Sequence, residues 1–363
     1  MGNSRHIHLV GLGLIGGSIA GGLRDGPYRV TGWDQIEEHR REALERGIVE
    51  DVHPPEDLPE SVSGVVLAIP VPEMIPVAEA ILQTDQNPEF VTDVGSTKQQ
   101  VCEAMEELLP EDLPFIGAHP MAGSEDSGLG ASDPILFENA ITVITPTNPD
   151  QRYLLEVIQL WESLGAHVIE MDPEEHDRTV AHVSHLPHLN AAALLHGVRS
   201  VEDYENNLLP LAAGGFRDTT RVAEGDPDLW RDIFETNRDQ VLEAINSFMT
   251  VLEDARTQIE EGDWSALTEW LDQARDVRDQ IPEKTKGLIG SLFELKILAP
   301  DEPGILAQIT GVLAEESINI SDIEVLRVRE GERGSIRLGF RHREELNRAR
   351  AVLSEANGDI EII

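Results

Sequence analysis

The chain of 363 residues carries 68 acidic and 28 basic residues, so its formal net charge is −40, and 40% of its residues are hydrophobic. Its length allows two or three domains with complete hydrophobic cores. A surface with this charge repels nucleic acid and anionic membranes, and no apolar run reaches the roughly 18 residues of a membrane span. The composition therefore excludes a nucleic-acid partner, a membrane partner and a membrane-spanning protein.

The acidic residues are spread along the whole chain, and only four of the basic residues are lysines. Self-repulsion at this charge destabilises a compact state unless salt screens it, and the screening length is about 3 Å near 1 M salt. Acidity together with lysine depletion predicts a protein from a salt-loaded cytoplasm, a halophile; a merely acidic mesophilic protein is the alternative. The single cysteine, Cys102, excludes an internal disulfide, and no secretory or myristoylation signal is visible. A cytoplasmic location is expected.

Short β-rich runs alternate with helical patterns over the first 150 residues, which is typical of βαβ units and a parallel sheet. A helix is predicted over Gly16–Arg24. Strands are predicted at His6–Val10, Tyr28–Trp33, Val65–Ile69, Phe90–Val94, Phe115–Ala118 and Ile141–Ile144. The sequence thus predicts an α/β dinucleotide-binding (Rossmann) domain over residues 1–150.

Helical periodicity dominates the next part of the chain, with one strand predicted at His167–Glu170. The helical segments are 151–164, 174–197, 200–213, 227–260 and 263–280. An all-α domain that provides substrate contacts and a dimer interface is therefore expected over residues 151–284.

A linker is predicted at Ile281–Gly287, followed by a third domain over residues 290–363. Its strands and helices follow the order β-α-β-β-α-β, which is typical of a ferredoxin-like fold. The predicted elements are Ser291–Leu298, Pro303–Glu315, Ile318–Arg329, Gly334–Arg341, Glu344–Ala356 and a closing strand.

A glycine-rich turn, Gly11-Leu-Gly-Leu-Ile-Gly16, follows the first strand and opens a helix, and Asp34 closes the next strand. Gly11 makes the tight turn, Gly13 lets the backbone approach a pyrophosphate, and Gly16 packs the helix on the strand. The carboxylate of Asp34 would accept hydrogen bonds from the ribose hydroxyls and repel a 2′-phosphate, which favours NAD over NADP. The expected cofactor-binding residues are Gly11, Gly13, Leu14, Ile15, Gly16, Asp34 and Pro70.

Two further motifs carry reactive side chains. Asp93-Val-Gly-Ser-Thr-Lys98 ends a strand at the carboxyl edge of the sheet, where ligands of open α/β folds bind. His119-Pro-Met-Ala-Gly-Ser-Glu125 holds a histidine on a tight turn, and an imidazole suits proton transfer at neutral pH. The two motifs predict a base beside the nucleotide.

Together with His185-Leu-Pro-His188 and Gly214-Gly-Phe-Arg-Asp-Thr-Thr-Arg221, the order of these motifs resembles that of prephenate dehydrogenases, over nearly the whole chain. The resemblance implies NAD-dependent oxidative decarboxylation of prephenate to 4-hydroxyphenylpyruvate in tyrosine biosynthesis. His119 is then the general base and Ser96 its hydrogen-bonding partner or that of the substrate hydroxyl. The residues expected on the substrate side are Arg221, which grips a carboxylate, His188, His185, Glu125 and Lys98.

The third domain resembles an ACT domain, an amino-acid sensor, because Asp301-Glu-Pro-Gly-Ile-Leu306 and Ile318-Asn-Ile-Ser321 match the ligand turns of that family. Asp301, Gly304 and Asn319 are the expected effector-binding residues. Tyrosine, the end product of the pathway, is the expected effector, and a homodimer is the expected assembly.

Several alternatives stay open. Arogenate in place of prephenate keeps the same fold and motifs. A β-hydroxyacid dehydrogenase shares the nucleotide turn, and a non-catalytic NAD-bound amino-acid sensor shares the third domain. Zinc bound by His182, His185 and His188 is disfavoured, because Pro187 interrupts a regular helix there and no cysteine is near. No metal is expected, and the start of the chain at the first nucleotide strand predicts no fused chorismate mutase.

Overall fold

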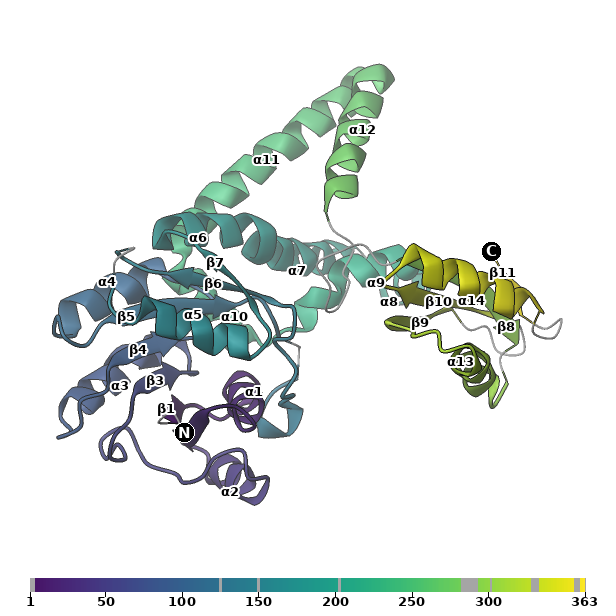
Figure 1. Cartoon of the computed structure of the whole chain (residues 1–363). Coiled ribbons are helices and arrows are strands. Elements are labelled where there is room, and N and C mark those ends of the chain that lie inside the picture. Colours follow the sequence, from purple (N-terminus) through teal and green to yellow (C-terminus); the bar gives the residue numbers. More distant parts are fainter. Residues whose placement is uncertain are drawn as a thin grey trace. The chain divides into compact units, whose positions relative to one another are not determined.

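A computed structural model describes residues 4–123, 126–148, 151–201, 204–281, 293–300, 302–327, 333–355 and 360–362. The chain forms two compact units, Met1–Arg278 and Asp279–Ile363 (Figure 1). The first contains a large sheet with its flanking helices and the helical segments that follow it, and the second contains a small sheet with two helices.

A seven-stranded sheet in the order β2-β1-β3-β4-β5-β6-β7 forms the centre of the first unit. Strands β1 to β5 are parallel, as expected, whereas β6 pairs antiparallel with β5 and parallel with β7. No crossover helix joins β5 to β6 among the described residues, and an antiparallel neighbour needs none. The sheet continues past residue 150, where the sequence pattern turns helical. Its strands are β1 (Arg5–Val10), β2 (Tyr28–Trp33), β3 (Gly64–Leu67), β4 (Phe90–Asp93), β5 (Phe115–Pro120), β6 (Ile141–Thr145) and β7 (His167–Glu170).

Both faces of this sheet are covered. Val65 and Leu67 belong to one buried hydrophobic cluster and Val66 to another, which follows from the alternation of side chains along a strand. Burial on both faces explains why the strands read as continuous apolar runs. The helices that accompany the sheet are α1 (Leu14–Leu23), α2 (Glu37–Glu45), α3 (Val71–Leu82), α4 (Gln99–Leu108) and α5 (Leu154–Ser163).

The helix expected over 174–197 is present as α6 (Pro173–Val180) and α7 (Leu186–Arg199), joined by one π-helical turn, Ala181–His185. Asp172 caps α6 by accepting from the backbone N–H groups of Glu174 and Glu175. Pro187 lies in the first turn of α7, where its missing N–H has no partner to lose. The proline is therefore accommodated at a helix start, next to the π-helical turn.

Two other expected helices differ from the structure. The segment 200–213 contains α8 (Tyr204–Asn207) and a 3₁₀ turn at Leu209–Leu211 that includes Pro210, so the expectation of one helix is wrong there. The segment 227–260 is divided at Asn237 into α10 (Pro227–Thr236) and α11 (Arg238–Glu261). The remaining helical elements of this unit are α9 (Gly214–Thr220), the 3₁₀ turn Arg221–Glu224 and α12 (Trp264–Gln280).

The second unit confirms the expected β-α-β-β-α-β order. Its sheet has the order β11-β8-β10-β9 with antiparallel pairs. Both helices pack in one cluster with the sheet, through Ile309 and Leu313 from the first helix, Leu353 from the second, and Ile297 and Leu338 from the strands. The elements are β8 (Phe293–Pro300), α13 (Ile305–Glu315), β9 (Asp322–Arg327), β10 (Arg333–Phe340), α14 (Arg343–Glu355) and β11 (Glu361–Ile362).

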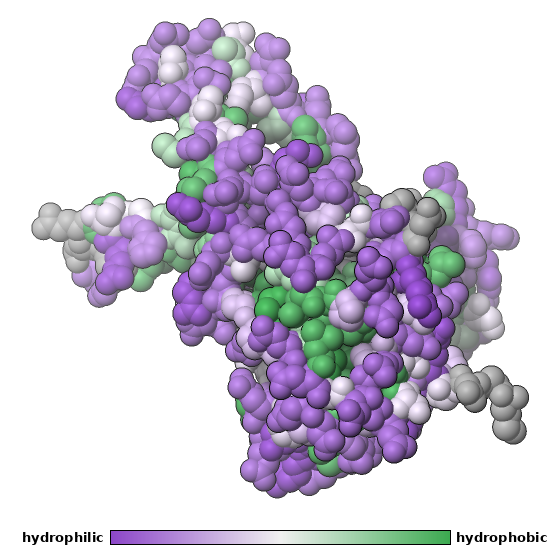
Figure 2. Space-filling view, turned by 90° about the vertical axis from the view of Figure 1, so that its left-hand side faces the viewer, coloured by the Kyte–Doolittle hydropathy of each residue, from purple (hydrophilic) through white to green (hydrophobic). Residues whose placement is uncertain are grey.

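The molecular surface follows the composition. Figure 2 shows a mostly hydrophilic surface with a large hydrophobic region near the centre of the side in view and smaller ones elsewhere. Within the part of the chain that the structure describes, no helix is both long enough and apolar enough to cross a membrane.

Candidate active site

The glycine turn between β1 and α1 is shaped by contacts that a side chain would destroy. A Cβ atom at Gly11, whose φ is +97°, would lie 2.1 Å from the carbonyl oxygen of Ala68, and one at Gly16 would lie 1.9 Å from the oxygen of Gly11. Gly13 has nothing within 4 Å of its Cβ position. The turn is therefore packed at two glycines and open at the third, at the N-terminus of α1, where a pyrophosphate can approach.

Asp34 is fixed beside this turn. Its carboxylate accepts hydrogen bonds from the backbone N–H groups of Leu12 (2.7 Å) and Ile36 (2.8 Å), and His39 Nδ1 lies 3.2 Å away. Each carboxylate oxygen keeps a lone pair for a ribose hydroxyl. Arg40 donates instead to the backbone oxygen of Asp34 and stacks on Trp33 at 4.3 Å. The residues present thus fit the adenosine half of NAD.

A cleft of about 370 Å³ joins the glycine turn to the predicted base. Gly13, Leu14, Ile15 and Pro70 line it together with Ser96 and His119, and α10 adds Leu229, Ile233 and Thr236. Thr97 and Thr236 are hydrogen bonded through their hydroxyls at 2.8 Å, which ties the Ser96 loop to α10. The structure therefore brings together the nucleotide turn, Ser96 and His119, as expected from their motifs.

His119 lies at the end of β5 and is 8% exposed. Its Nδ1 lies 2.8 Å from Nε2 of His176, whose Nδ1 lies 2.8 Å from Oδ1 of Asp177. Burial, followed by the charges of His176, Lys98 and His185, holds the pKa of His119 well below its usual value. The imidazole is therefore neutral at physiological pH and able to accept a proton.

Lys98 does not line the cleft. It is 0% exposed, and its ammonium group pairs with the carboxylate of Asp93, which also accepts from the backbone N–H groups of Gly95 (2.8 Å) and Ala118 (2.9 Å). The ammonium group of Lys98 is already paired with Asp93, and its expected contact with substrate stays a prediction. Its effect reaches the site through the electrostatic field on His119.

His185 and His188 lie outside the lining of the cleft. His188 stacks on Trp230 with ring centroids 3.6 Å apart, and His185 meets the same indole edge-on at 6.1 Å. Burial lowers the pKa of His185 to about 4, although Asp177 opposes the shift, and burial also lowers the pKa of His188. Both rings are neutral at physiological pH, so they are suited to hydrogen bonding rather than to binding a carboxylate by charge.

The structure does not place the other residues expected on the substrate side, Arg221 and Glu125, in the cleft. Arg221 is exposed at the C-terminal end of α9 and does not line the cleft. Glu125 lies outside the described residues. His182 is exposed and its Nδ1 lies 2.9 Å from the backbone oxygen of Arg178. Within the described ranges, no group of three or more His, Cys, Asp or Glu residues is arranged to hold a metal.

Three polar residues at the site carried no motif in the sequence. His176, Asp177 and Asn237 are buried, and Asn237 Nδ2 donates to the backbone oxygen of Asp177 (2.8 Å) and lies 3.2 Å from His185 Nδ1. The available signal was weak: His176 and Asp177 share the inner side of a predicted helix with Val180. Polar residues on an apolar helix face need buried partners, and here the partners come from distant segments.

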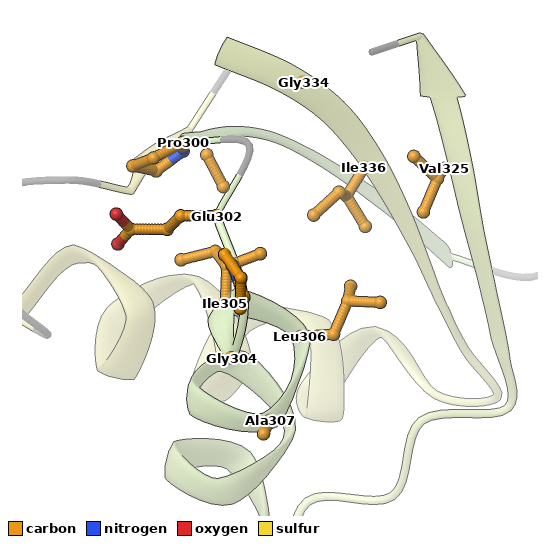
Figure 3. Close-up of a pocket in the computed structure, with 11 residues that line it drawn as sticks. Pro300, Glu302, Gly304, Ile305, Leu306, Ala307, Val325, Gly334 and Ile336 are labelled. Carbon is orange, nitrogen blue, oxygen red and sulfur yellow. The ribbon is translucent and has the colours of Figure 1, made fainter. Parts of the chain in front are cut away.

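The second unit has a cavity of its own, of about 410 Å³. Figure 3 shows Gly304 at the start of α13 and the side chains of Leu306, Val325 and Ile336 around the cavity. Gly304, whose φ is +100°, lines the cavity as expected for an effector site. Asn319 is exposed and is not among the lining residues, and Asp301 lies outside the described residues. The described lining is mostly apolar, with Glu302 as a charged exception.

A glycine turn fitted to a dinucleotide, in one cleft with a neutral buried histidine, defines a dinucleotide-dependent dehydrogenase. Family models match three consecutive parts of the chain: the nucleotide-binding domain of prephenate dehydrogenase (residues 19–170), its dimerization domain (172–273) and the ACT domain (293–358). The chain is 37% identical to the prephenate dehydrogenase of Bacillus subtilis (strain 168), over 98% of this chain and 97% of that protein. The chain belongs to the prephenate dehydrogenase family.

Solved structures agree with this assignment. The prephenate dehydrogenase of Aquifex aeolicus, in complex with hydroxyphenyl propionate and NAD⁺, is 33% identical with a TM-score of 0.71, covering 77% of this chain and 98% of that one. The arogenate dehydrogenase of Synechocystis is 32% identical with a TM-score of 0.67, covering 76% of this chain and 100% of that one. Together with the three family-model matches, these structures confirm the Rossmann, helical and ACT organisation.

Proposed function

We propose that the protein catalyses the NAD-dependent oxidative decarboxylation of prephenate to 4-hydroxyphenylpyruvate, a step of tyrosine biosynthesis. The observation that carries the proposal is the position of the buried imidazole of His119 in the same cleft as the glycine turn. Removing a hydride from a carbinol also requires removal of the hydroxyl proton, and this histidine is placed and poised to accept it. Prephenate dehydrogenase relatives that align over nearly the whole chain support the same substrate.

Gly11, Gly13 and Gly16 would hold the pyrophosphate of NAD at the start of α1, and Asp34 would bind the adenosine ribose. When bound, NAD accepts the hydride. The apolar residues Leu14, Ile15 and Pro70 line the same cleft and would help to exclude water once substrate and NAD are bound. The chain's own contribution is thus binding, orientation and exclusion of water.

Proton removal falls to His119. Its Nδ1 is engaged by His176, so Nε2 is the nitrogen that would take the proton of the substrate hydroxyl. Loss of the ring carboxylate as CO₂ makes the ring aromatic, which renders the step irreversible. The protein therefore needs little beyond orientation, a proton acceptor and groups that hold the substrate's anionic ends.

Those anionic ends need local positive charge in a chain of net charge −40. We assign the substrate carboxylate to Arg221, whose guanidinium can bind it bidentately, and the substrate hydroxyl to Ser96 with His119. His188 and His185 remain proposed as neutral hydrogen-bonding partners on the substrate side, and Glu125 as an acid at its entrance. Arg221 lies outside the lining of the cleft, so this assignment rests on its motif rather than on its position.

The experiment is to measure NADH formation with prephenate and with arogenate in parallel, for the wild-type protein and for His119→Asn. Loss of the general base should reduce kcat by about 10²–10⁴-fold and leave NAD binding intact. His182→Asn, which changes an exposed histidine, is the matched control. Faster turnover of arogenate would show that arogenate, not prephenate, is the preferred substrate. A near-normal rate for His119→Asn would show that His119 is not the general base.

We also infer a homodimer formed through the helical domain. Exposed apolar side chains of Leu242, Met249, Leu252 and Ile259 follow one side of α11. A match to the dimerization domain model over residues 172–273 supports this assembly. Light scattering after size exclusion would test it: Met249→Glu should yield a monomer if α11 lies in the interface, and an unchanged mass would exclude that face.

Regulation by tyrosine is the proposal for the second unit. The cavity beside Gly304 offers a positive-φ turn for a backbone-like carboxylate or amine and an apolar wall for a side chain. Calorimetry with tyrosine and phenylalanine would test the identity of the effector, and the absence of heat for any amino acid would leave the domain structural. The cytoplasmic location expected from the single buried cysteine stays a prediction as well.

A further inference from the structure

A buried hydrogen-bonded chain leads from His119 into the helical part of the first unit. It runs from His119 Nδ1 to His176 Nε2 and from His176 Nδ1 to Asp177 Oδ1, each at 2.8 Å. His176 and Asp177 are each 1% exposed. Resting on the proposed function, we propose that His176 and Asp177 are positioning residues, which fix the tautomer of His119 so that its Nε2 lone pair faces the substrate.

The direction of the chain follows from its terminal group. An ionised carboxylate only accepts hydrogen bonds, so His176 Nδ1 must donate to Asp177. A His176 ring whose single proton is on Nδ1 has a lone pair on Nε2, which accepts from His119 Nδ1. With its proton on Nδ1, the neutral His119 ring carries its lone pair on Nε2. One carboxylate thus determines which nitrogen of the base is free to take a proton.

The carboxylate itself is held from two further directions. Asp177 Oδ1 accepts from the backbone N–H of Lys98 (2.7 Å) and Oδ2 from that of Gln99 (2.9 Å), at the N-terminus of α4. The Asp177 backbone oxygen accepts from Asn237 Nδ2 (2.8 Å). Both ends of the residue are fixed, so the carboxylate cannot turn away from His176 without losing buried hydrogen bonds.

The same network assigns the opposite tautomer to His185. Asn237 must direct its NH₂ group at the Asp177 carbonyl, and that nitrogen also lies 3.2 Å from His185 Nδ1, which therefore accepts. The His185 proton is then on Nε2, a buried atom with no partner among the described residues. The network therefore makes Nε2 of His119 a hydrogen-bond acceptor and Nε2 of His185 a donor.

A purely structural role for Asp177 is the competing explanation, because its carboxylate also caps α4. Loss of a cap lowers the stability of the helix. On that explanation, replacing His176 would lower the amount of folded protein without altering turnover per folded molecule. The two explanations therefore differ in kcat, measured on folded protein, and in the ring nitrogen that carries the His119 proton.

The main variants are His176→Phe and His176→Gln. Phenylalanine fills the space but offers no acceptor, so the His119 proton should move to Nε2, where the cleft can solvate it. We expect kcat to fall by at least about 10²-fold, the scale on which a wrongly set histidine tautomer costs activity, with KM for NAD and prephenate changed by less than about threefold. Glutamine offers an oxygen at the end of a comparable side chain and should recover at least about tenfold of that loss.

A second pair of variants compares two capping carboxylates: Asp177, which lies in α6 and caps α4, and Asp172, which caps α6. Asp177→Ala should reduce kcat as His176→Phe does, whereas Asp172→Ala, which removes the cap of α6 itself, should change stability alone. If both alanine variants lose activity only in proportion to their folded fraction, the positioning role is refuted. The same holds if folded His176→Phe keeps kcat within about threefold of the wild type.

A spectroscopic measurement on the wild-type protein makes the test independent of substrate and of the folding of the His176 and Asp177 variants. Nitrogen NMR of the protein with ¹⁵N-labelled histidine, with the His119 signals assigned by their loss in His119→Asn, should show a protonated Nδ1 and a bare Nε2. His185, assigned in the same way, should show the reverse. A protonated Nε2 on His119 would overturn the inference even in an active enzyme. Failure to oxidise prephenate would refute the proposed function and leave this readout untouched.

Discussion

The fully buried imidazole of His8 predicts how the stability of the first unit falls in acid. His8 lies in β1 with 0% exposure, and its Nδ1 lies 2.9 Å from Thr31 Oγ1. Its Nε2 is buried without a partner among the described residues. Burial, followed by the charges of His53 and His6, lowers the pKa of His8 from 6.5 to about 3.

The sign of the effect follows from proton binding. Above pH 6.5 the His8 ring is neutral in both the folded and the unfolded chain. Between pH 6.5 and about 3, the unfolded chain binds a proton at His8 and the folded chain does not. The free energy of unfolding therefore falls by about 1.4 kcal/mol for each pH unit below 6.5. Between pH 7.5 and 5.0 His8 should account for about 2 kcal/mol of lost stability. Below a pH of about 3, the folded chain also binds the proton, so the stability lost through His8 reaches a maximum of about 5 kcal/mol.

Urea unfolding at the two pH values would measure this, for the wild-type protein and for His8→Leu, which removes the ring nitrogens at similar volume. Tryptophan fluorescence reports the first unit, because all five tryptophans precede residue 279. The carboxylates titrate in both proteins and cancel, so the stability lost between pH 7.5 and 5.0 should be about 2 kcal/mol smaller in the variant. Replacement of the exposed His196 by Leu should leave it unchanged. An equal loss in wild type and His8→Leu would refute the reasoning.

Four further outcomes are expected. The acid limb of kcat should lie below pH 6.5, because the pKa of His119 is lowered and the neutral base persists as pH falls; a limb at or above 6.5, seen in a pH profile, would assign the base elsewhere. Arg221→Ala should raise KM for prephenate by about tenfold with NAD affinity unchanged. Steady-state kinetics with a weaker affinity for NAD and an unchanged KM for prephenate would show that another residue binds the substrate carboxylate. Asp34→Asn should shift the ratio of kcat/KM for NAD and NADP toward NADP, since a repelling charge is lost; an unchanged ratio would move discrimination to another residue. Melting temperature and kcat/KM should both rise between about 0.05 and 2 M KCl if the charge of −40 reflects a saline cytoplasm, and flat or falling values would contradict that origin.

The parts of the site that the sequence predicts are those whose chemistry is local. Gly11, Gly13 and Gly16 sit in one turn, and their roles depend on backbone atoms a few residues away or on the adjoining strand. Asp34 closes the strand next to that turn, so its place follows from the βαβ unit alone. Ser96 and His119 each end a strand at the same edge of the sheet, which brings them into one cleft.

The parts that could not be predicted depend on partners far along the chain. Lys98 pairs with Asp93 of its own motif, but its complete burial depends on segments outside that motif, because α4 packs against β5 and α6. Asp177 reads as an ordinary helix acid until its carboxylate meets the backbone of Lys98 and Gln99, 79 and 78 positions away. Periodicity and motif spacing do not report such long-range contacts, so the sequence alone does not identify the partners of these residues.

Two departures from regular helical structure in the first unit adjoin the hydrogen-bonded network of the proposed base. The continuous helical pattern over 227–260 breaks at Asn237, whose amide is needed by Asp177 and close to His185, and the π-helical turn Ala181–His185 ends at that same histidine. Each departure costs stability that a regular helix would keep, and π-helical turns occur mostly at functional sites. Local departures that adjoin one set of buried polar groups point to a function for those groups. The network around Asp177 is therefore better explained by what it imposes on His119 than by the stability of the helices that carry it.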